Sequence, residues 1–422
     1  MKVFMLGWEF PPFISGGLGT ACYGLTKAMS NLGTEITFVL PRAGASSDSS
    51  HVKMRSAEGY IKVQDGVEFK NVHFKTIQSS LKPYVSSCDI GCGCHTEKKN
   101  NSTSSWQNSF SENQQNYSGD IYEQVKYYAH KAAEIASVED FDVIHAHDWM
   151  TYPAGLAVAA VSGKPLVVHV HSTEFDRSGD NVNQFVYDIE RRGVHCADKV
   201  IAVSHYTKNI VTSRYAISSE KIEVVHNGVE NNYSSCFKAR PENAEKIVLF
   251  LGRITMQKGP EYFIAAAKKV LEKINNVKFI MAGDGDMTHR MIEYAASIGI
   301  GHKVFFTRFL RGADVDRAFK MADLYVMPSV SEPFGIAPLE ALRNNVPVLI
   351  CKQSGIAETL MSALKVDFWD VNEMANKIAA VLKYSPLTGV LRENGSAELR
   401  KFRWEDAAAK VNKIYNETLT CA

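Results

Sequence analysis

Short apolar runs alternate with amphipathic stretches along most of the chain. In the first half, apolar runs of strand length occur at Val3–Leu6, Ile36–Leu40, Val143–His145, Leu166–His171, Val200–Val203 and Ile222–Val225. Helical patterns lie between several of them, at Cys22–Asn31, Tyr122–Ser137 and Thr207–Arg214. Strands that alternate with helices predict a parallel sheet that is covered on both faces.

The same alternation starts again after residues 231–245, a polar stretch typical of a linker. Strand patterns follow at Ile247–Leu251, Lys278–Ala282, Val304–Thr307, Leu324–Met327 and Val346–Cys351. Helical patterns follow at Tyr262–Lys273, His289–Ile298, Val315–Met321 and Pro338–Asn344, and a last helix is predicted over Ala397–Thr418, with Trp404 as a bulky anchor.

The two sets of elements predict an α/β protein with two doubly wound, Rossmann-like domains that face a cleft. We place the first domain at residues 1–235, the second at residues 244–390 and a terminal helix at residues 395–420. The length of 422 residues also favours two or three domains over one.

The charge and the apolar start of the chain narrow the class of protein. The formal net charge is +1, a balance that argues against a nucleic-acid-binding protein or a strongly membrane-attracted surface. The apolar run Val3–Leu6 is too short for a transmembrane helix or for the apolar core of a signal peptide. We therefore expect a cytoplasmic protein without a transmembrane segment.

Three of the eight cysteines cluster in a polar segment. Cys88, Cys92 and Cys94 precede His95, and three thiols with one imidazole can form a structural zinc site. The spacing is poor for this purpose, because adjacent ligands rarely reach one tetrahedral centre without strain. The surrounding residues 85–120 are rich in Ser and Asn, so we interpret them as a flexible insertion in the first domain.

A glycine-rich loop follows the first predicted strand. Ligands of open α/β sheets bind beyond the carboxyl ends of the strands, and Gly16-Gly17-Leu18-Gly19 lies in such a loop. Glycine lets the backbone approach a ligand, and the N-terminus of the following helix favours an anion. The pattern is neither G-x-G-x-x-G nor a Walker motif with its lysine. On these residues alone, a phosphate-binding loop and a loop without a ligand are equal alternatives.

Histidines follow two further predicted strands. The stretch HAHDW contains His147 and Asp148, and HVHSTEFDR contains His171 and Glu174. A histidine at a strand end is a candidate acid, base or hydrogen-bond donor. Metal ligands are an alternative, although the sequence offers no convincing third ligand, and a buried structural histidine is another. Two separate strand ends that bring histidines to one region favour a functional role.

Two loops of the second half carry charged residues after strands. Arg253 and Lys258 of LGRITMQKG suit the charge of a diphosphate. In MPSVSEPFGIAPLEAL, Glu332 lies in a loop and Glu340 in the first turn of a helix, where two carboxylates suit the hydroxyls of a sugar and a ribose. The plainer alternatives are a solvated loop and a carboxylate that stabilises the helix dipole.

These motifs together resemble the retaining family 4 glycosyltransferases of the GT-B fold. GGLG, HAHDW, HSTEFDR, GR-x4-KG, AGDG and SEPFG with E-x7-E occur in order over essentially the whole chain except residues 85–120. HAHDW and the start WEFPP resemble the glycogen and starch synthase branch. The resemblance implies transfer of a hexose, with glucose as the expected sugar, from a nucleotide sugar such as UDP- or ADP-glucose to an oligo- or polysaccharide. It implies retention, no cofactor, no metal, and a last helix that crosses back to the first domain.

The resemblance also implies roles for particular residues. The catalytic group would be His147 near the transferred sugar, Arg253 and Lys258 at the diphosphate and Glu332 at the donor sugar. Residues that would bind the donor are Gly16, Gly17, Gly283, Phe334, Gly335, Ile336, Ala337 and Glu340. Residues that would lie near the acceptor are His171, Asp148 and Glu174.

One departure bears on the acceptor. Bacterial glycogen synthases often carry K-T-G-G-L near the start, whereas residues 14–18 of this chain read ISGGL. A cell-surface polysaccharide or a glycolipid is therefore an alternative product, although the helix Cys22–Asn31 has only Lys27 as a basic residue for a lipid surface. The alternatives without transfer are a nucleotide-sugar-binding protein, which should have lost Lys258 or Glu332, and a GT-B epimerase.

Overall fold

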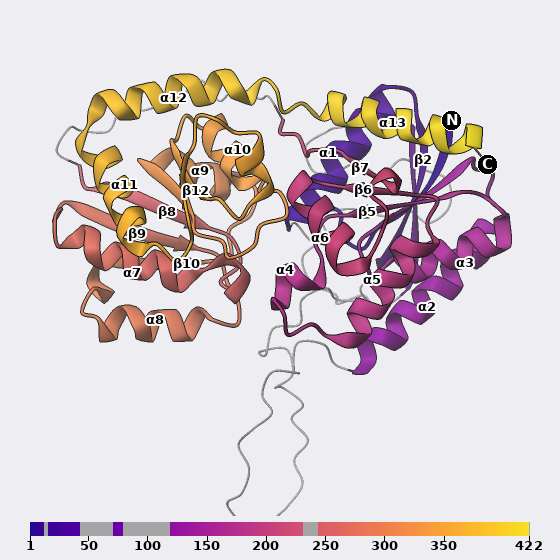
Figure 1. The fold of residues 1–422 in the computed structure, drawn as a ribbon, viewed down its shortest axis with the longest axis horizontal. Coiled ribbons are helices and arrows are strands. Elements are labelled where there is room, and N and C mark those ends of the chain that lie inside the picture. The colour runs from indigo at the N-terminus through magenta and orange to yellow at the C-terminus, as the bar shows by residue number, and fades with distance from the viewer. Residues whose placement is uncertain (12–15, 43–70, 79–118, 231–243, 422) are drawn as a thin grey trace, which may run out of the picture.

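A computed structural model describes residues 1–11, 16–42, 71–78, 119–230 and 244–421. These residues form two α/β lobes that lie side by side, and the C-terminal helices run along one side of both (Figure 1). The predicted α/β class with two parallel sheets is confirmed. The cluster of Cys88, Cys92, Cys94 and His95 lies outside the described residues, as does most of the predicted insertion.

The sheet of the first lobe has the strand order β3-β2-β1-β4-β5-β6-β7 among the described residues, and all its neighbouring strands are parallel. Its strands are β1 (Lys2–Leu6), β2 (Glu35–Arg42), β3 (Val72–Gln78), β4 (Val143–His147), β5 (Leu166–Val170), β6 (Lys199–Ala202) and β7 (Ile222–Val224). Every residue of β4 and β5 is buried, as expected for parallel strands that are covered on both faces.

The helices of the first lobe are α1 (Gly17–Asn31), α2 (Gly119–Ala136), α3 (Tyr152–Ser162), α4 (Glu174–Ser178), α5 (Gln184–Cys196) and α6 (His205–Tyr215), with the short turn η1 (Ser219–Lys221). Helix α1 begins at Gly17, before the predicted start at Cys22, and Gly16 is its extended N-cap residue. The glycine-rich stretch is therefore already the first turn of the helix.

The sheet of the second lobe has the order β10-β9-β8-β11-β12-β13 and is also parallel. Its strands are β8 (Lys246–Leu251), β9 (Val277–Ala282), β10 (Val304–Arg308), β11 (Leu324–Met327), β12 (Val348–Cys351) and β13 (Leu364–Val366). Its helices are α7 (Pro260–Leu271), α8 (Thr288–Ser297), α9 (Ala313–Met321), α10 (Ala337–Arg343) and α11 (Val371–Lys383). Its 3-10 turns are η2 (Met256–Lys258), η3 (Gly301–Lys303) and η4 (Gly355–Glu358).

The C-terminal segment consists of two helices, α12 (Ser385–Leu399) and α13 (Trp404–Cys421). The prediction of one helix over Ala397–Thr418 is wrong, because the chain leaves the helical path between α12 and α13. Helix α12 packs on α10 and α11 of the second lobe, whereas α13 packs on α1 and joins the core of the first. Trp404 lies so close to Gly24 of α1 that an added Cβ there would be 2.3 Å from its indole nitrogen.

Contacts between the lobes join loops that follow strands of both sheets. Helix α4 lies against η2, and α6 lies against η4. Ser331 Oγ donates to Asp176 Oδ1 at 2.6 Å, and Tyr206 Oη lies 3.0 Å from the same hydroxyl. We call the region around Glu9, Asp176, Tyr206, Arg253 and Ser331 the interlobe seam.

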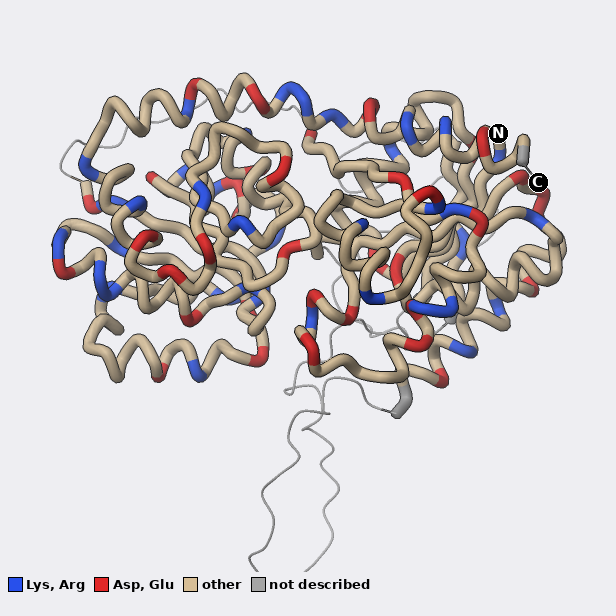
Figure 2. The backbone as a smooth tube through the Cα atoms, viewed as in Figure 1, with Lys and Arg blue, Asp and Glu red and all other residues tan. Residues whose placement is uncertain are grey.

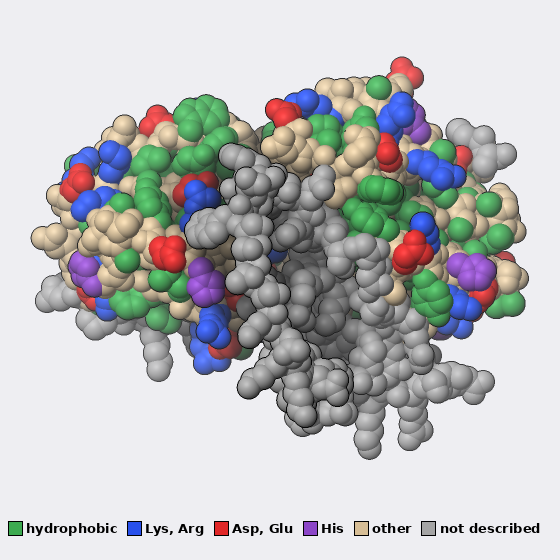
Figure 3. Space-filling model, turned by 90° about the horizontal axis from the view of Figure 1, so that it is seen from below, with side chains coloured by type: hydrophobic (Ala, Val, Ile, Leu, Met, Phe, Trp, Pro, Cys, Tyr) green, Lys and Arg blue, Asp and Glu red, His purple; other side chains and the backbone are tan. Residues whose placement is uncertain are grey.

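The surface charge is mixed on both lobes. Basic and acidic residues alternate along the backbone of each lobe (Figure 2) and are interspersed on the face seen from below (Figure 3). This distribution agrees with the net charge of +1. Among the described helices, none is both long and apolar enough to cross a bilayer.

Candidate active site

The first-lobe side of the seam begins with Glu9, a carboxyl group after β1. Glu9 is 1% exposed and accepts a 3.0 Å hydrogen bond from the backbone N–H of Gly19 on Oε2. Burial raises the pKa of Glu9 to about 7, although the N–H of Gly19 and the charge of Arg253 act in the opposite direction. Its Oε1 atom has no hydrogen-bond partner among the described residues. Arg253 of the second lobe therefore lies within electrostatic range of this loop.

The two predicted glycines differ in their surroundings. A Cβ added at Gly16 would lie 2.9 Å from Glu9 Oε2, so this position must be small for the carboxyl to pack. A Cβ added at Gly17 would meet no described atom within 4 Å. Among the described residues, nothing therefore covers the start of α1 on the side of Gly17, as a helix N-terminus that receives an anion requires.

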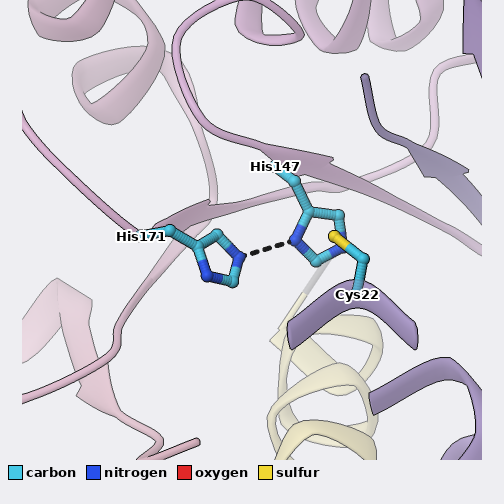
Figure 4. Close-up of side chains that lie close together, drawn as sticks. All are labelled: Cys22, His147 and His171. Atoms are coloured by element: carbon cyan, nitrogen blue, oxygen red, sulfur yellow. Dashed lines mark hydrogen bonds between the residues drawn. The ribbon is translucent and has the colours of Figure 1, made fainter. Parts of the chain in front are cut away.

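His147 and His171 are brought together by the neighbouring strands β4 and β5. His147 Nδ1 lies 2.9 Å from His171 Nε2, and the Nε2 atom of the fully buried His147 has no hydrogen-bond partner among the described residues (Figure 4). Burial lowers the pKa of His147 to about 3. The ring is therefore neutral at physiological pH, and it can accept or donate a hydrogen bond but brings no positive charge.

Asp148 and Glu174 are both engaged in contacts within the first lobe. Asp148 adopts a left-handed backbone with φ of 59°, and its Oδ1 accepts the N–H groups of His171 at 2.7 Å and Ser172 at 3.3 Å. The carboxylate of Glu174 binds Arg177 at 3.0 Å and accepts hydrogen bonds from the Ser178 hydroxyl and the Asn183 N–H. Asp148 therefore positions the chain at His171, and Glu174 holds α4 in place.

The second-lobe side of the seam holds a charged pair. Lys258 of η2 and Glu332, which follows β11, approach to 2.5 Å between Nζ and Oε2. The side chains are 21% and 12% exposed, so a ligand that enters the seam can reach both. Ser329 Oγ adds a 3.3 Å hydrogen bond to the same carboxylate oxygen, and Arg253 contacts Gln257 at 3.4 Å.

The backbone conformation of the second lobe requires glycine at two of the predicted donor-binding positions. Gly283 has a φ of 145°, and a Cβ there would lie 1.8 Å from the carbonyl oxygen of Gly252. This residue lets the turns after β8 and β9 pass each other, whether or not a ligand is bound. Gly335 has a φ of 104°, a conformation that disfavours side chains and turns the chain into α10.

The predicted start of a helix near Pro338 is close to the observed start of α10 at Ala337. Ile336 is its N-cap residue, and Phe334 is buried just before it. Glu340 lies in the first turn of α10, where burial raises the pKa of its carboxyl group. The backbone before α10 and this carboxyl group therefore lie on the same short segment of the second lobe.

Three residues of the site were missed in the sequence. The sequence patterns single out none of Glu9, Asp176 and Cys22, although Asp176 belongs to the stretch HVHSTEFDR. Only the folded chain brings Asp176 to Ser331 and Cys22 to His147. The one local signal for Glu9 is its charge shortly after an apolar strand, because a buried charged residue seldom lacks a partner.

The chemistry that this arrangement allows differs between the two sides of the seam. The first lobe offers neutral imidazoles, a buried carboxyl group and an open helix N-terminus. The second lobe offers Arg253 and Lys258, two cations that can neutralise a leaving anion, and carboxylates that can accept hydrogen bonds from hydroxyl groups. A substrate with both a polyhydroxyl group and a phosphate would satisfy both sides.

Known proteins with similar sequences are glycosyltransferases. Residues 235–398 match the family "Glycosyl transferases group 1", and residues 117–233 match "Glycosyltransferase Family 4". An uncharacterized glycosyltransferase of Methanocaldococcus jannaschii is 27% identical, with 98% of each chain covered. Glycogen synthase of Mycobacterium tuberculosis is 23% identical over 98% of this chain and 94% of its own.

Solved structures agree on the fold. HepE from Anabaena, solved in complex with UDP-glucose, superposes with a TM-score of 0.69 at 18% identity and covers 100% of both chains. The two family matches run in order through both lobes and include every predicted site residue except those of the N-terminal glycine loop. The chain therefore belongs to the family 4 type of GT-B glycosyltransferases.

Proposed function

We propose that this glycosyltransferase moves a glucosyl group from a nucleotide sugar, UDP- or ADP-glucose, to a glycan acceptor in the manner of a glycogen synthase. We further propose that transfer retains the anomeric configuration and requires no metal ion. The similarity to the mycobacterial glycogen synthase over nearly the whole chain supports a glycan acceptor. The UDP-glucose held by the Anabaena protein of the same fold supports the donor.

One observation carries the proposal. At the seam, α4 of the first lobe lies against η2, the turn that carries Lys258, and the charge of Arg253 acts on Glu9 of the first lobe. The glycine loop and the two cations would therefore line one site, although more than 200 residues separate Glu9 from Arg253 in the sequence. A nucleotide sugar bound there would have its diphosphate between the N-terminus of α1 and the cations of the second lobe.

The second lobe would bind the donor. Lys258 and Glu332 neutralise each other across 2.5 Å, and a diphosphate would take over Lys258 while a sugar hydroxyl donates to Glu332. Arg253 would bind the same diphosphate. Glu340 would accept hydrogen bonds from the ribose, and the remaining contacts would come from Gly283, Phe334, Gly335, Ile336 and Ala337.

The first lobe would bind the transferred sugar and the acceptor. Gly16 and Gly17 would approach the diphosphate, and the neutral His147 would contact the sugar through its unpaired Nε2. His171 would lie near the acceptor, with Asp148 and Glu174 holding the chain around it. When the bond between the sugar and the phosphate breaks, its electron pair goes to the diphosphate, and the cations of the second lobe stabilise that charge in the transition state.

A ligand panel with a product assay tests this function. Ligands that bind the native state raise its stability, so we expect UDP- or ADP-glucose to raise the thermal midpoint more than GDP-mannose. The same donor should extend a maltooligosaccharide, with the configuration of the new bond read by NMR, at an undiminished rate in a chelator. No shift with any nucleotide sugar would contradict the donor site. Transfer to a lipid-linked acceptor alone would favour the glycolipid alternative.

A further inference from the structure

Four histidines form a buried cluster at the carboxyl ends of β4 and β5. His145 Nε2 lies 3.2 Å from His169 Nδ1, and His147 Nδ1 lies 2.9 Å from His171 Nε2. The Nε2 atoms of His147 and His169 are buried without a hydrogen-bond partner among the described residues. Buried polar atoms are nearly always paired, so two unpaired nitrogens in one cluster need an explanation that the transfer reaction only partly provides.

Helix α1 adds a thiol to this cluster. Cys22 is 1% exposed, and it offers a sulfur atom that lies, with one nitrogen each of His147 and His171, in a group of atoms within 4.8 Å of one another (Figure 4). Zinc holds sulfur at about 2.3 Å and imidazole nitrogen at about 2.0 Å. Two ligand atoms of one zinc ion therefore lie closer together than 4.8 Å. A small approach of the three side chains would bring them to one tetrahedral centre.

We propose that Cys22, His147 and His171 form a binding site for one Zn²⁺ ion. Thiolate and imidazole are the ligands that this ion prefers. Binding forms one Zn–S and two Zn–N bonds, and the thiol proton of Cys22 is released to solvent. Neutral imidazoles each retain a nitrogen without a proton, so the two histidines need not be deprotonated. The fourth position stays open to water.

Access favours this group over a second one in the same cluster. His145, His147 and His169 also offer nitrogens within 4.8 Å of one another, but all three are at most 1% exposed, and His145 Nδ1 is in contact with the Tyr415 hydroxyl. His171 is only partly buried, so an ion can enter beside it. Because both groups contain His147, the cluster binds one ion.

The ion acts as an inhibitor of transfer. Zinc on His147 occupies the imidazole that would contact the transferred sugar, and it takes His171 as well. This consequence rests on the proposed function, whereas binding of the ion does not. It agrees with a transfer reaction that needs no metal, because the proposed ion competes with the substrate instead of activating it.

Metal binding is tested first without any substrate. Cys88, Cys92 and Cys94 also carry thiols and lie outside the described residues, so the starting protein is the full chain with all three changed to Ser. Cobalt is the spectroscopic probe for zinc. We expect one Co²⁺ per chain with a thiolate-to-cobalt charge-transfer band, which zinc displaces.

Variants of the ligands decide the assignment. In Cys22→Ser the band should disappear. Loss of a residue that only supports a metal ligand lowers affinity by about 10–100-fold. Loss of the ligand Cys22 itself should lower zinc affinity by more than that. His171→Gln should also weaken binding, and it decides the matter if Cys22→Ser does not fold. The control Cys351→Ser changes a buried cysteine of the second lobe and should leave the band unchanged.

Two results would overturn the site: no stoichiometric binding in the starting protein, or an unchanged band in both ligand variants. A transfer assay then separates the site from the function. We expect zinc to inhibit the starting protein and to have at least about 10-fold weaker effect on Cys22→Ser. Stoichiometric binding without inhibition would support the metal site and count against the proposed role of His147.

Discussion

The two sides of the interlobe seam differ in the burial and charge of their polar side chains. On the first lobe, burial shifts three titratable groups toward their neutral forms, because it raises the pKa of Glu9 and Asp148 to about 7 and lowers that of His147 to about 3. On the second lobe, Lys258 and Glu332 form a partly exposed ion pair. The first side is a desolvated polar surface, and the second is a charged one.

This difference indicates how a donor would be oriented. Buried neutral groups hold hydroxyls by directed hydrogen bonds, whereas a diphosphate needs full opposite charges. The cations of the second lobe would therefore hold most of the phosphate charge, and the sugar would lie between Glu332 of the second lobe and His147 of the first. Changes to Lys258 or Glu332 on the second side should then mainly affect the rate of transfer, and a change to Glu9 on the first side should mainly affect stability and its dependence on pH.

Loss of Lys258 is expected to have the largest effect. Lys258→Ala should lower kcat by about 10²–10³-fold, because removal of one preorganised group that stabilises a developing anion costs about that much. Glu332→Ala should also lose most of the transfer activity. The measurement is steady-state transfer with the nucleotide sugar that gives the largest thermal shift.

An ion pair at the opposite ends of the same two strands serves as control. Lys246 Nζ lies 3.4 Å from Asp323 Oδ1 at the amino ends of β8 and β11. Lys246→Ala removes a similar ion pair from the same two strands, but far from their carboxyl ends, and should leave kcat within about 2-fold, since exposed pairs contribute little. Near-normal turnover in Lys258→Ala would contradict the charged side of the comparison.

The periodicity of the chain was sufficient to predict most strands and the parallel arrangement of the two sheets. Periodicity was insufficient for elements whose apolar residues do not recur at the spacing of an amphipathic helix or a buried strand. Helix α3, YPAGLAVAAVS, is apolar on nearly all sides and shows no amphipathic period. Strand β3, VHFKTIQ, lies at the sheet edge and mixes polar with apolar residues. The break before Trp404 has no proline or glycine to indicate it.

Candidate site residues could be predicted where they belong to a sequence motif in a loop that follows a strand. Arg253, Lys258 and Glu332 follow strands and form recognisable motifs, so their positions needed no contact information. Other residues of the site could be found only from contacts in the folded chain. The contacts of Glu9 with Gly19, of Asp176 with Ser331 and of Cys22 with the histidines all join segments that only the folded chain brings together.

The neutral side is tested by the pH dependence of stability in Glu9→Gln. The pKa of Glu9 is about 7 in the native state against 4.5 as its ordinary value, so the native protein holds a proton that the unfolded chain has lost. Its contribution to stability is fully present below pH 4.5 and is lost as the pH rises through 7. The full change is on the order of 3 kcal/mol for one group.

Glu9→Gln should therefore show a smaller loss of thermal stability than the wild type when the pH rises from about 5 to about 8. Asp148 has a similarly raised pKa, so part of the dependence should remain. The control is Glu123→Gln, since Glu123 is 69% exposed on α2. Parallel pH profiles for the wild type and Glu9→Gln would show that Glu9 is already ionised in the native protein.

The smallest expected effect concerns the contact that joins the two sides. Ser331 donates to the buried Asp176 at 2.6 Å, although Asp176 also accepts the N–H and hydroxyl of Thr173 at 2.8 Å each. Ser331→Ala should therefore lower the stability by about 1–3 kcal/mol, the cost of leaving one buried acceptor unpaired. The measurement is the thermal midpoint without and with nucleotide sugar.

A double-mutant cycle with Asp176→Asn separates this hydrogen bond from general packing. Because the bond crosses the seam, the two single changes should be non-additive by at least about 0.5 kcal/mol, the lower end of values for residues in contact. Tyr206→Phe removes the other hydroxyl near Ser331 and keeps the Asp176 contact, so its effect should be smaller. Additive effects of Ser331→Ala and Asp176→Asn would mean that this hydrogen bond does not couple the two sides of the seam.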